Sequence, residues 1–192
     1  MLKKLLILVL SLLIILPSTL AYGAAPKIKP PNIINLSGII NNDSASDLVV
    51  QIHKMNGPVI IIIDSPGGSV FAGLEIIKAI KHYPEPVMCV VDGIAASMAA
   101  VILESCDGRA ATIYSVVMLH GGSTQLDERV NEHELKEATQ VLDVVNRAMA
   151  EIVAPRLGMT VDEYLALTEA HELWFTARQA LEHHVIDKVI ED

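Results

Sequence analysis

A run of five apolar residues, VIIII at positions 59–63, constrains the fold of this chain more than any other stretch. Such an uninterrupted β-branched run is typical of a strand covered on both faces in a parallel sheet. A second run, VMCVV at 87–91, follows after one helical pattern at 70–82. Alternating buried strands and helices predict right-handed crossovers and a mostly parallel sheet with helices on its faces. The fold class is therefore α/β.

The rest of the chain continues this alternation. Further strands are predicted at residues 33–40 and within 109–119, and further helices at 43–55 and 94–105. The closing segment, 162–190, has the pattern of two short helices and a last strand.

Residues 126–155 form a longer helical pattern with an apolar stripe: Leu135, Ala138, Leu142, Val145 and Met149. A helix of about 28 residues would be about 42 Å long, which is longer than a domain of this size needs. We expect this helix to project from the domain. Its stripe then favours pairing with another copy of the chain, so the sequence predicts a homo-oligomer.

The first 25 residues have the pattern of a secretory signal peptide. Lys3 and Lys4 precede an apolar run at 5–16, and small residues follow as far as Ala25. The run is about 12 residues long, short of the roughly 20 that cross a bilayer as a helix. We predict a leader, residues 1–25, ahead of a single domain, residues 26–192. The protein would be exported, periplasmic or secreted; an uncleaved membrane anchor is the alternative.

Composition excludes other classes of function. The chain has 14 Lys and Arg against 23 Asp and Glu and a formal net charge of −9, with no basic cluster, which argues against nucleic acid as a partner. Cys89 and Cys106 fit neither a zinc pattern nor a disulfide framework, and no cofactor or metal is expected. A helix packed on a sheet lies about 10 Å from it, whereas a disulfide needs Cα atoms within about 7 Å. We expect two free, buried thiols.

Three conspicuous segments follow successive predicted strands: SPGG at 65–68, GIAAS at 93–97 and HGG at 120–122. Open parallel sheets bind ligands beyond the carboxyl ends of their strands, so we expect these segments to lie together. Ser97, in the first turn of a helix, is then a candidate nucleophile, and His120 a candidate general base. The alternative is that the small residues around Ser97 serve only close helix packing and that His120 is structural.

The SPGG segment has two possible uses. Paired glycines let backbone N–H groups point into a crevice, where they bind a phosphate or the oxyanion of acyl transfer. No Lys-Ser or Lys-Thr pair follows, as a P-loop requires, so the oxyanion role is favoured. The N–H groups of Gly68 and of Met98, the residue after Ser97, are the predicted donors.

Four segments, SPGGSV, GIAASMAA, VMLHGG and WFTARQALEHHVID, resemble segments of the Clp protease proteolytic subunit family and occur in the same order. The resemblance covers residues 32–190. It implies a ClpP/crotonase-type fold and a serine peptidase with Ser97 as nucleophile and His120 as base. Gly68 and Met98 would form the oxyanion hole, and helix 126–155 would be the handle through which rings of subunits stack.

The chain departs from the family in two respects. The family's triad acid is an aspartate shortly before the segment that WFTA resembles, but TEAHELWFTA contains none. Glu172 best occupies that position, with Glu169 and His171 as alternatives. Cytoplasmic members of the family work with ATP-driven unfoldases, whereas the leader indicates a compartment without ATP. We therefore expect a serine endopeptidase that cleaves peptides or unfolded proteins without an ATPase.

Three other functions compete with this one. The missing aspartate favours a catalytically inactive ClpP-like scaffold. Signal-peptide-peptidase-like proteases share the S-P-G-G turn but resemble a Ser-Lys dyad; after His120 only Lys136 and Lys188 remain, and neither is an obvious base. A crotonase-like enzyme acting on acyl-CoA would not need the serine.

Overall fold

The structure is a computed structural model, and it describes residues 32–123 and 131–191. The leader expected at 1–25 and the first residues of the expected handle lie outside the described residues. Within those residues no helix is both long enough and apolar enough to span a membrane.

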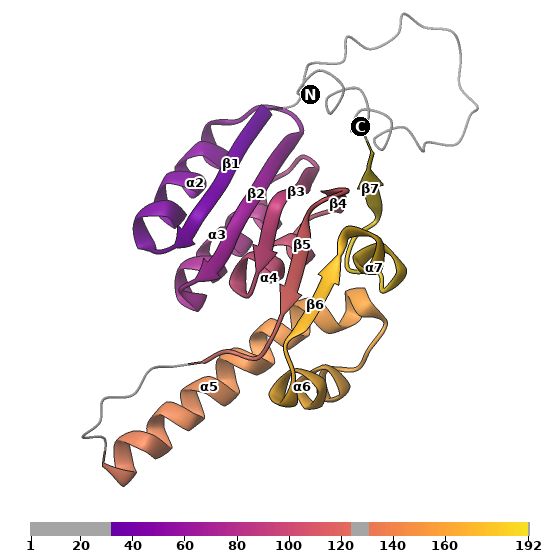
Figure 1. Ribbon diagram of the computed structural model, residues 1–192. Helices are drawn as coiled ribbons and strands as arrows, with labels where there is room; N and C mark the ends of the chain where they lie inside the picture. Colours follow the sequence, from indigo (N-terminus) through magenta and orange to yellow (C-terminus); the bar gives the residue numbers. More distant parts are fainter. Residues whose placement is uncertain (1–31, 124–130, 192) are drawn as a thin grey trace, which may run out of the picture.

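A mixed sheet forms the centre of the described chain (Figure 1). Its path runs β1 (Asn32–Ile40), β2 (Val59–Gly68), β3 (Val87–Ala96), β4 (Gly108–Thr112) and β7 (Lys188–Ile190), all in parallel pairs. Strand β5 (Val116–Leu119) also pairs in parallel with β3, and β6 (Leu173–Thr176) pairs antiparallel with β5. The expected α/β fold with a mostly parallel sheet is confirmed.

Three helices cover one face of this sheet: α2 (Asn42–Lys54), α3 (Val70–His82) and α4 (Met98–Ser105). Alternate residues of a strand point to opposite faces, and β2 shows the consequence. Ile61 and Ile63 join the main core beneath the helices, whereas Ile60 belongs to a smaller apolar cluster with Met88 and Val90. The side chains of the uninterrupted apolar run thus belong to two apolar clusters, one on each face of the sheet.

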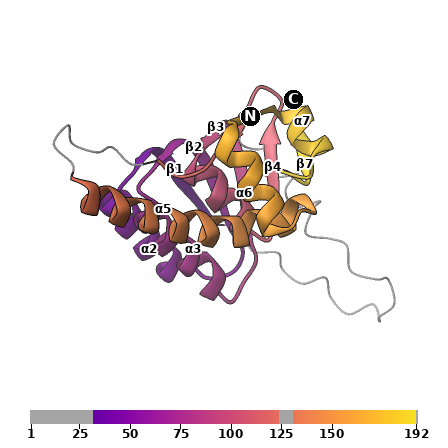
Figure 2. The same cartoon turned by 90° about the horizontal axis from the view of Figure 1, so that it is seen from below.

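The long helix α5 (Glu132–Val153) begins behind an Asn131 cap and runs on into a 3₁₀ turn (Ala154–Leu157). Pro155 lies in that turn, close to the end expected from the sequence, and it cannot continue a helical hydrogen-bond ladder. The last turns of α5 are buried, and its earlier part carries exposed apolar residues: Leu135, Val141 and Val144. Figures 1 and 2 show that this earlier part extends beyond the sheet. Within α5, the described part of the handle, the C-terminal turns therefore pack on the domain and the earlier turns are exposed.

The C-terminal region adds α6 (Val161–Ala170), β6, α7 (Ala177–Glu182) and β7. The sequence pattern predicted the two helices and the last strand but not β6. This strand is short, with alternating half-buried and exposed side chains, and it forms only because β5 offers it a free edge.

The expectation of two free thiols is wrong: Cys89 and Cys106 form a disulfide, with Cα atoms 5.9 Å apart. The 10 Å spacing applies to a helix lying over a sheet, but Cys106 is the C-cap of α4, where the chain returns to the sheet. The Asp107 N–H donates to the Val87 carbonyl at 2.9 Å, which places the end of α4 beside the start of β3. The disulfide thus ties together the two ends of the β3–α4 unit.

A largely buried hydrogen-bonded network lies near this disulfide. Arg109 is bonded to both Glu104 and Asp187, and Arg156 donates to the main-chain carbonyl of Glu104 at 3.2 Å. Burial raises the pKa of Glu104 to about 8, although the charge of Arg109 acts in the opposite direction. For Asp187, burial acts to raise the pKa, but the hydrogen bonds and charge of Arg109 outweigh it and the pKa is lowered.

Glu104→Gln should change how stability depends on pH. The folded state holds a proton on Glu104 that the unfolded state releases above its ordinary pKa of 4.5, so this group makes folding less favourable as pH rises from 4.5 towards 8. The loss is on the order of a few kcal/mol. Urea unfolding at pH 5 to 8 should show the wild-type free energy of unfolding falling relative to that of Glu104→Gln. The exposed Glu151→Gln should follow the wild type, and parallel curves for all three proteins would contradict the assignment.

Candidate active site

The site begins where strand β3 changes partner. Residues 88–91 of β3 pair with β4, but residues 94–96 pair with β5. Gly93, between the two halves, has a φ of 124°, and a β-carbon there would lie 2.4 Å from the Asp64 Oδ1 atom. The backbone at this fork therefore requires glycine. Because β5 pairs with the last residues of β3, the ends of these two strands lie side by side.

Ser97 lies directly between β3 and α4. Its φ and ψ are 56° and −126°, a left-handed backbone that excludes it from the first turn of the helix, where the sequence had placed it. The helix starts at Met98, and residues 94–96 continue the strand instead. We call this sharp turn at Ser97, between β3 and α4, the elbow. The Ser97 N–H donates to the Met118 carbonyl at 2.9 Å, which fixes the elbow against β5. The hydroxyl makes no capping bond to the helix.

Ser97→Gly should stabilise the protein while removing the hydroxyl. Glycine adopts a positive φ without the cost that other residues bear, so the free energy of unfolding should rise by about 1 kcal/mol. Urea denaturation measures the change. The control is Ser97→Ala, which also lacks the hydroxyl but keeps the β-carbon. If alanine stabilises the protein as much as glycine, backbone strain at Ser97 is not the cause.

His120 follows the last residue of β5 and reaches the serine directly. Its Nε2 atom lies 2.7 Å from the Ser97 Oγ atom, and both side chains are half-buried. This distance is within the range in which a general base takes a proton. With the proton on Nδ1, Nε2 accepts from the hydroxyl. The sequence-based expectation that the two residues meet at one edge of the sheet agrees with this geometry.

The glycine segment lies against the same elbow. It is not a separate turn, because β2 stays extended through Gly68. A β-carbon on Gly67 would lie 2.6 Å from the Ala96 carbonyl oxygen, and one on Gly68 would lie 2.2 Å from that of Ile40. The buried Ser65 hydroxyl accepts from the Gly67 N–H at 3.1 Å and donates to the Gly38 carbonyl at 2.6 Å, so it fixes the segment.

The two predicted amide donors, the N–H groups of Met98 and Gly68, come from different elements near the elbow. Met98 is the first residue of α4, so its N–H has no acceptor within the helix. Gly68 is exposed at the end of β2, next to the residue whose β-carbon would touch Ser97. The Gly67 N–H is already used by Ser65.

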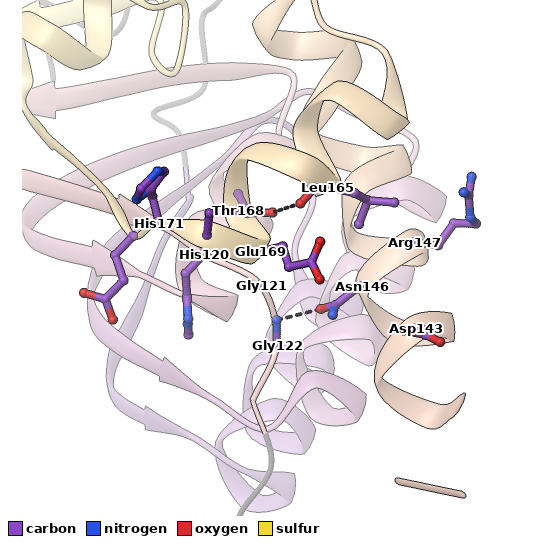
Figure 3. Close-up of a pocket in the computed structure, with 12 residues that line it drawn as sticks. His120, Gly121, Gly122, Asp143, Asn146, Arg147, Leu165, Thr168, Glu169 and His171 are labelled. Carbon is purple, nitrogen blue, oxygen red and sulfur yellow. Dashed lines mark hydrogen bonds between the residues drawn. The ribbon is translucent and has the colours of Figure 1, made fainter. Parts of the chain in front are cut away.

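A cavity of about 690 Å³ opens beside His120 (Figure 3). Glu172, Glu169 and His171 all line it, so each candidate for the third catalytic residue is near the site. The Glu172 Oε2 atom accepts a hydrogen bond from the Trp174 indole N–H at 3.0 Å. In the part of the chain that the structure describes, the imidazole of His120 has a hydrogen bond to Ser97 and none to a carboxylate. Glu172 stays a prediction.

The other walls of the cavity come from α5 and α6, which sequence reasoning did not connect with the site. They contribute Asp143, Asn146, Arg147, Leu165 and Thr168. No local motif marks these residues, because they reach the site only through the packing of two helices. Across residues 32–123 and 131–191, no group of three or more acidic, histidine or cysteine side chains could hold a metal ion.

A serine–histidine pair with nearby backbone amides, at the edge of a parallel sheet, is the arrangement that serine hydrolases use. The sequence matches the Clp protease family over residues 21–192, and the chain therefore belongs to that family.

Curated relatives agree with this assignment. The chain is 32% identical over 168 residues to ATP-dependent Clp protease proteolytic subunit 2 of Prochlorococcus marinus (strain MIT 9312), covering 82% of this chain and 80% of the relative. It is 33% identical over 141 residues to subunit 3 of Rhodococcus jostii (strain RHA1), covering 69% and 65%. Subunit 3 of Synechococcus sp. (strain CC9902) is 30% identical over 168 residues, covering 82% of each chain. Family membership supports a serine-type peptidase function.

Proposed function

We propose that this protein is a serine endopeptidase that works through an acyl-enzyme. The contact of 2.7 Å between Ser97 Oγ and His120 Nε2 carries the proposal. Ser97 Oγ attacks the carbonyl carbon of the scissile peptide bond while His120 Nε2 takes the hydroxyl proton. His120 then gives that proton to the leaving amine as the carbon–nitrogen bond breaks. Water, activated by His120, hydrolyses the ester and restores Ser97.

The tetrahedral intermediate carries a negative charge on the former carbonyl oxygen. We propose that the N–H groups of Gly68 and Met98 stabilise it, since one is at the exposed end of β2 and the other at the free start of α4. Loss of one such donor typically costs about 10²- to 10³-fold in kcat. Glu172 is our first candidate to orient His120, and it would have to turn from Trp174 towards the imidazole; Glu169 and His171 remain the alternatives.

The substrates would be peptides or unfolded proteins, and the protein would act outside the cytoplasm without an ATPase. Two features support the location outside the cytoplasm, where an ATP-driven partner would lack ATP. Residues 1–25 have the composition of an export signal. The disulfide between Cys89 and Cys106 is of a kind that persists in oxidising compartments. The curated relatives are named as subunits of ATP-dependent proteases, so independence from an ATPase would distinguish this chain from them.

Assembly into stacked rings would use the handle. Family membership supports a homo-oligomer, and the exposed apolar residues of α5 offer a surface for it: Leu135, Val141 and Val144. These side chains are 49%, 52% and 70% exposed in the single chain, so a partner helix could cover them.

Labelling with a fluorophosphonate tests the proposed chemistry. The wild-type protein should be labelled on Ser97, and Ser97→Ala should not be labelled, while size-exclusion chromatography with light scattering shows the same oligomer for both. A wild-type oligomer that resists labelling would overturn the peptidase proposal. It would favour the second candidate, an inactive scaffold, which the lack of a carboxylate on His120 in the described residues supports.

A further inference from the structure

The chain directly after His120 is attached to two helices. The Gly121 N–H donates to the Thr168 carbonyl of α6 at 3.3 Å. The Gly122 N–H donates to the side-chain Oδ1 atom of Asn146 in α5 at 2.6 Å (Figure 3). These bonds hold the two residues that directly follow His120. The position of His120 therefore depends on α5 and α6 as well as on the sheet.

Asn146 and Gly122 fit each other closely. A β-carbon on Gly122 would lie 2.9 Å from the Asn146 Oδ1 atom and 3.4 Å from the Met149 Cε atom. Asn146 itself is half-buried between Val145 and Met149, both of which are buried in the domain. Although Asn146 also borders the cavity, its side-chain oxygen is held by a backbone N–H, so this amide is tied to the segment that carries His120.

The base has few other constraints. In serine hydrolases a third group on Nδ1 normally holds the imidazole in its working orientation. Here Glu172 is bonded to Trp174, and among the described residues no carboxylate is bonded to His120. More of the orientation of His120 must therefore come from the placement of its backbone.

We propose that Asn146 is a positioning residue for His120. Its amide oxygen holds the Gly122 N–H and keeps the imidazole within reach of Ser97 Oγ. This inference rests on the proposed peptidase function, in which His120 is the base. It assigns a role at the site to the long helix, in addition to any role in assembly.

Two substitutions at Asn146 separate positioning from simple structural loss. Asn146→Ala removes the oxygen, and a displacement of about 1 Å can cost about 10²-fold in rate. We expect kcat and the rate of fluorophosphonate labelling to fall about 10- to 100-fold, with KM changed less than about 3-fold. Asn146→Asp keeps an oxygen acceptor and should recover most of the rate. Gln140→Ala, an exposed amide on the same helix, should behave as the wild type.

Several results would overturn the proposal. Full activity in Asn146→Ala would do so, as would a rise in KM at constant kcat, which would indicate substrate binding instead. Failure of Asn146→Asp to recover activity, with its oligomer intact, would do the same. If the wild type is not labelled at all, the proposed function fails, and ¹⁵N-histidine NMR still tests the placement. The His120 Nε2 signal, identified with Ser97→Ala, should shift in Asn146→Ala and return in Asn146→Asp; an unchanged signal would refute positioning.

Discussion

His120→Ala should lower kcat/KM for peptide hydrolysis by about 10⁴- to 10⁶-fold, the range seen when a serine hydrolase loses its base. The reason is that the Ser97 hydroxyl, 2.7 Å from Nε2, then has no group to take its proton. The amides of Gly68 and Met98 would remain and would leave a small residual rate above that in water. Cleavage of an unstructured fluorogenic peptide, followed over hours, gives the required sensitivity.

The control is His53→Ala, which removes an exposed histidine from α2, away from the site. It should keep the wild-type rate. Circular dichroism and light scattering should show that both variants keep the fold and the oligomer. A His120→Ala protein with more than about a tenth of the wild-type activity would mean that another group is the base. Lys136 and Lys188 would then have to be tested.

Loss of the disulfide should have the second large effect. Cys89 and Cys106 are 17 residues apart, and a bridge that closes a loop of this length stabilises a protein by about 3 kcal/mol. The double variant Cys89→Ala/Cys106→Ala should therefore have a lower free energy of unfolding in urea by about this amount. The bridge also joins the two ends of the β3–α4 unit that carries Ser97, so activity should be lost at a lower temperature.

Reduction separates the bridge from the packing of the two side chains. Unfolding of the wild type in dithiothreitol removes the bond but keeps both sulfur atoms, and it should show most of the loss. The double variant should be insensitive to dithiothreitol. If the reductant leaves the wild-type unfolding curve unchanged, the two cysteines are not bonded in the folded protein.

The features that the sequence predicted well depend on local pattern. The apolar runs at 59–63 and 87–91 lie within β2 and β3, because a β-branched run has few other stable environments. Ser97 and His120 were expected to meet because the ends of parallel strands share one edge of the sheet, and the structure places them in contact. Both follow from rules that apply within a few residues or between neighbouring strands.

The features that were missed depend on contacts between distant segments. Strand β6 forms from residues with no strong strand pattern because β5 provides an edge. The disulfide forms because the chain after α4 turns back to β3, which a helix-on-sheet spacing does not describe. Asn146 reaches the site through the packing of α5, and a single amide in a long helix gives no signal in the sequence.

The fork in β3 has a further consequence. Ser97 and His120 extend from paired strands, so the backbone ladder between β3 and β5 is the first determinant of their separation. Ser115, in the loop between β4 and β5, holds the fork itself: its hydroxyl accepts from the Gly93 N–H at 3.1 Å and donates to the Val91 carbonyl at 2.9 Å. A residue that touches neither reacting side chain can therefore still limit the bond-breaking step through the shape of the strands that carry them.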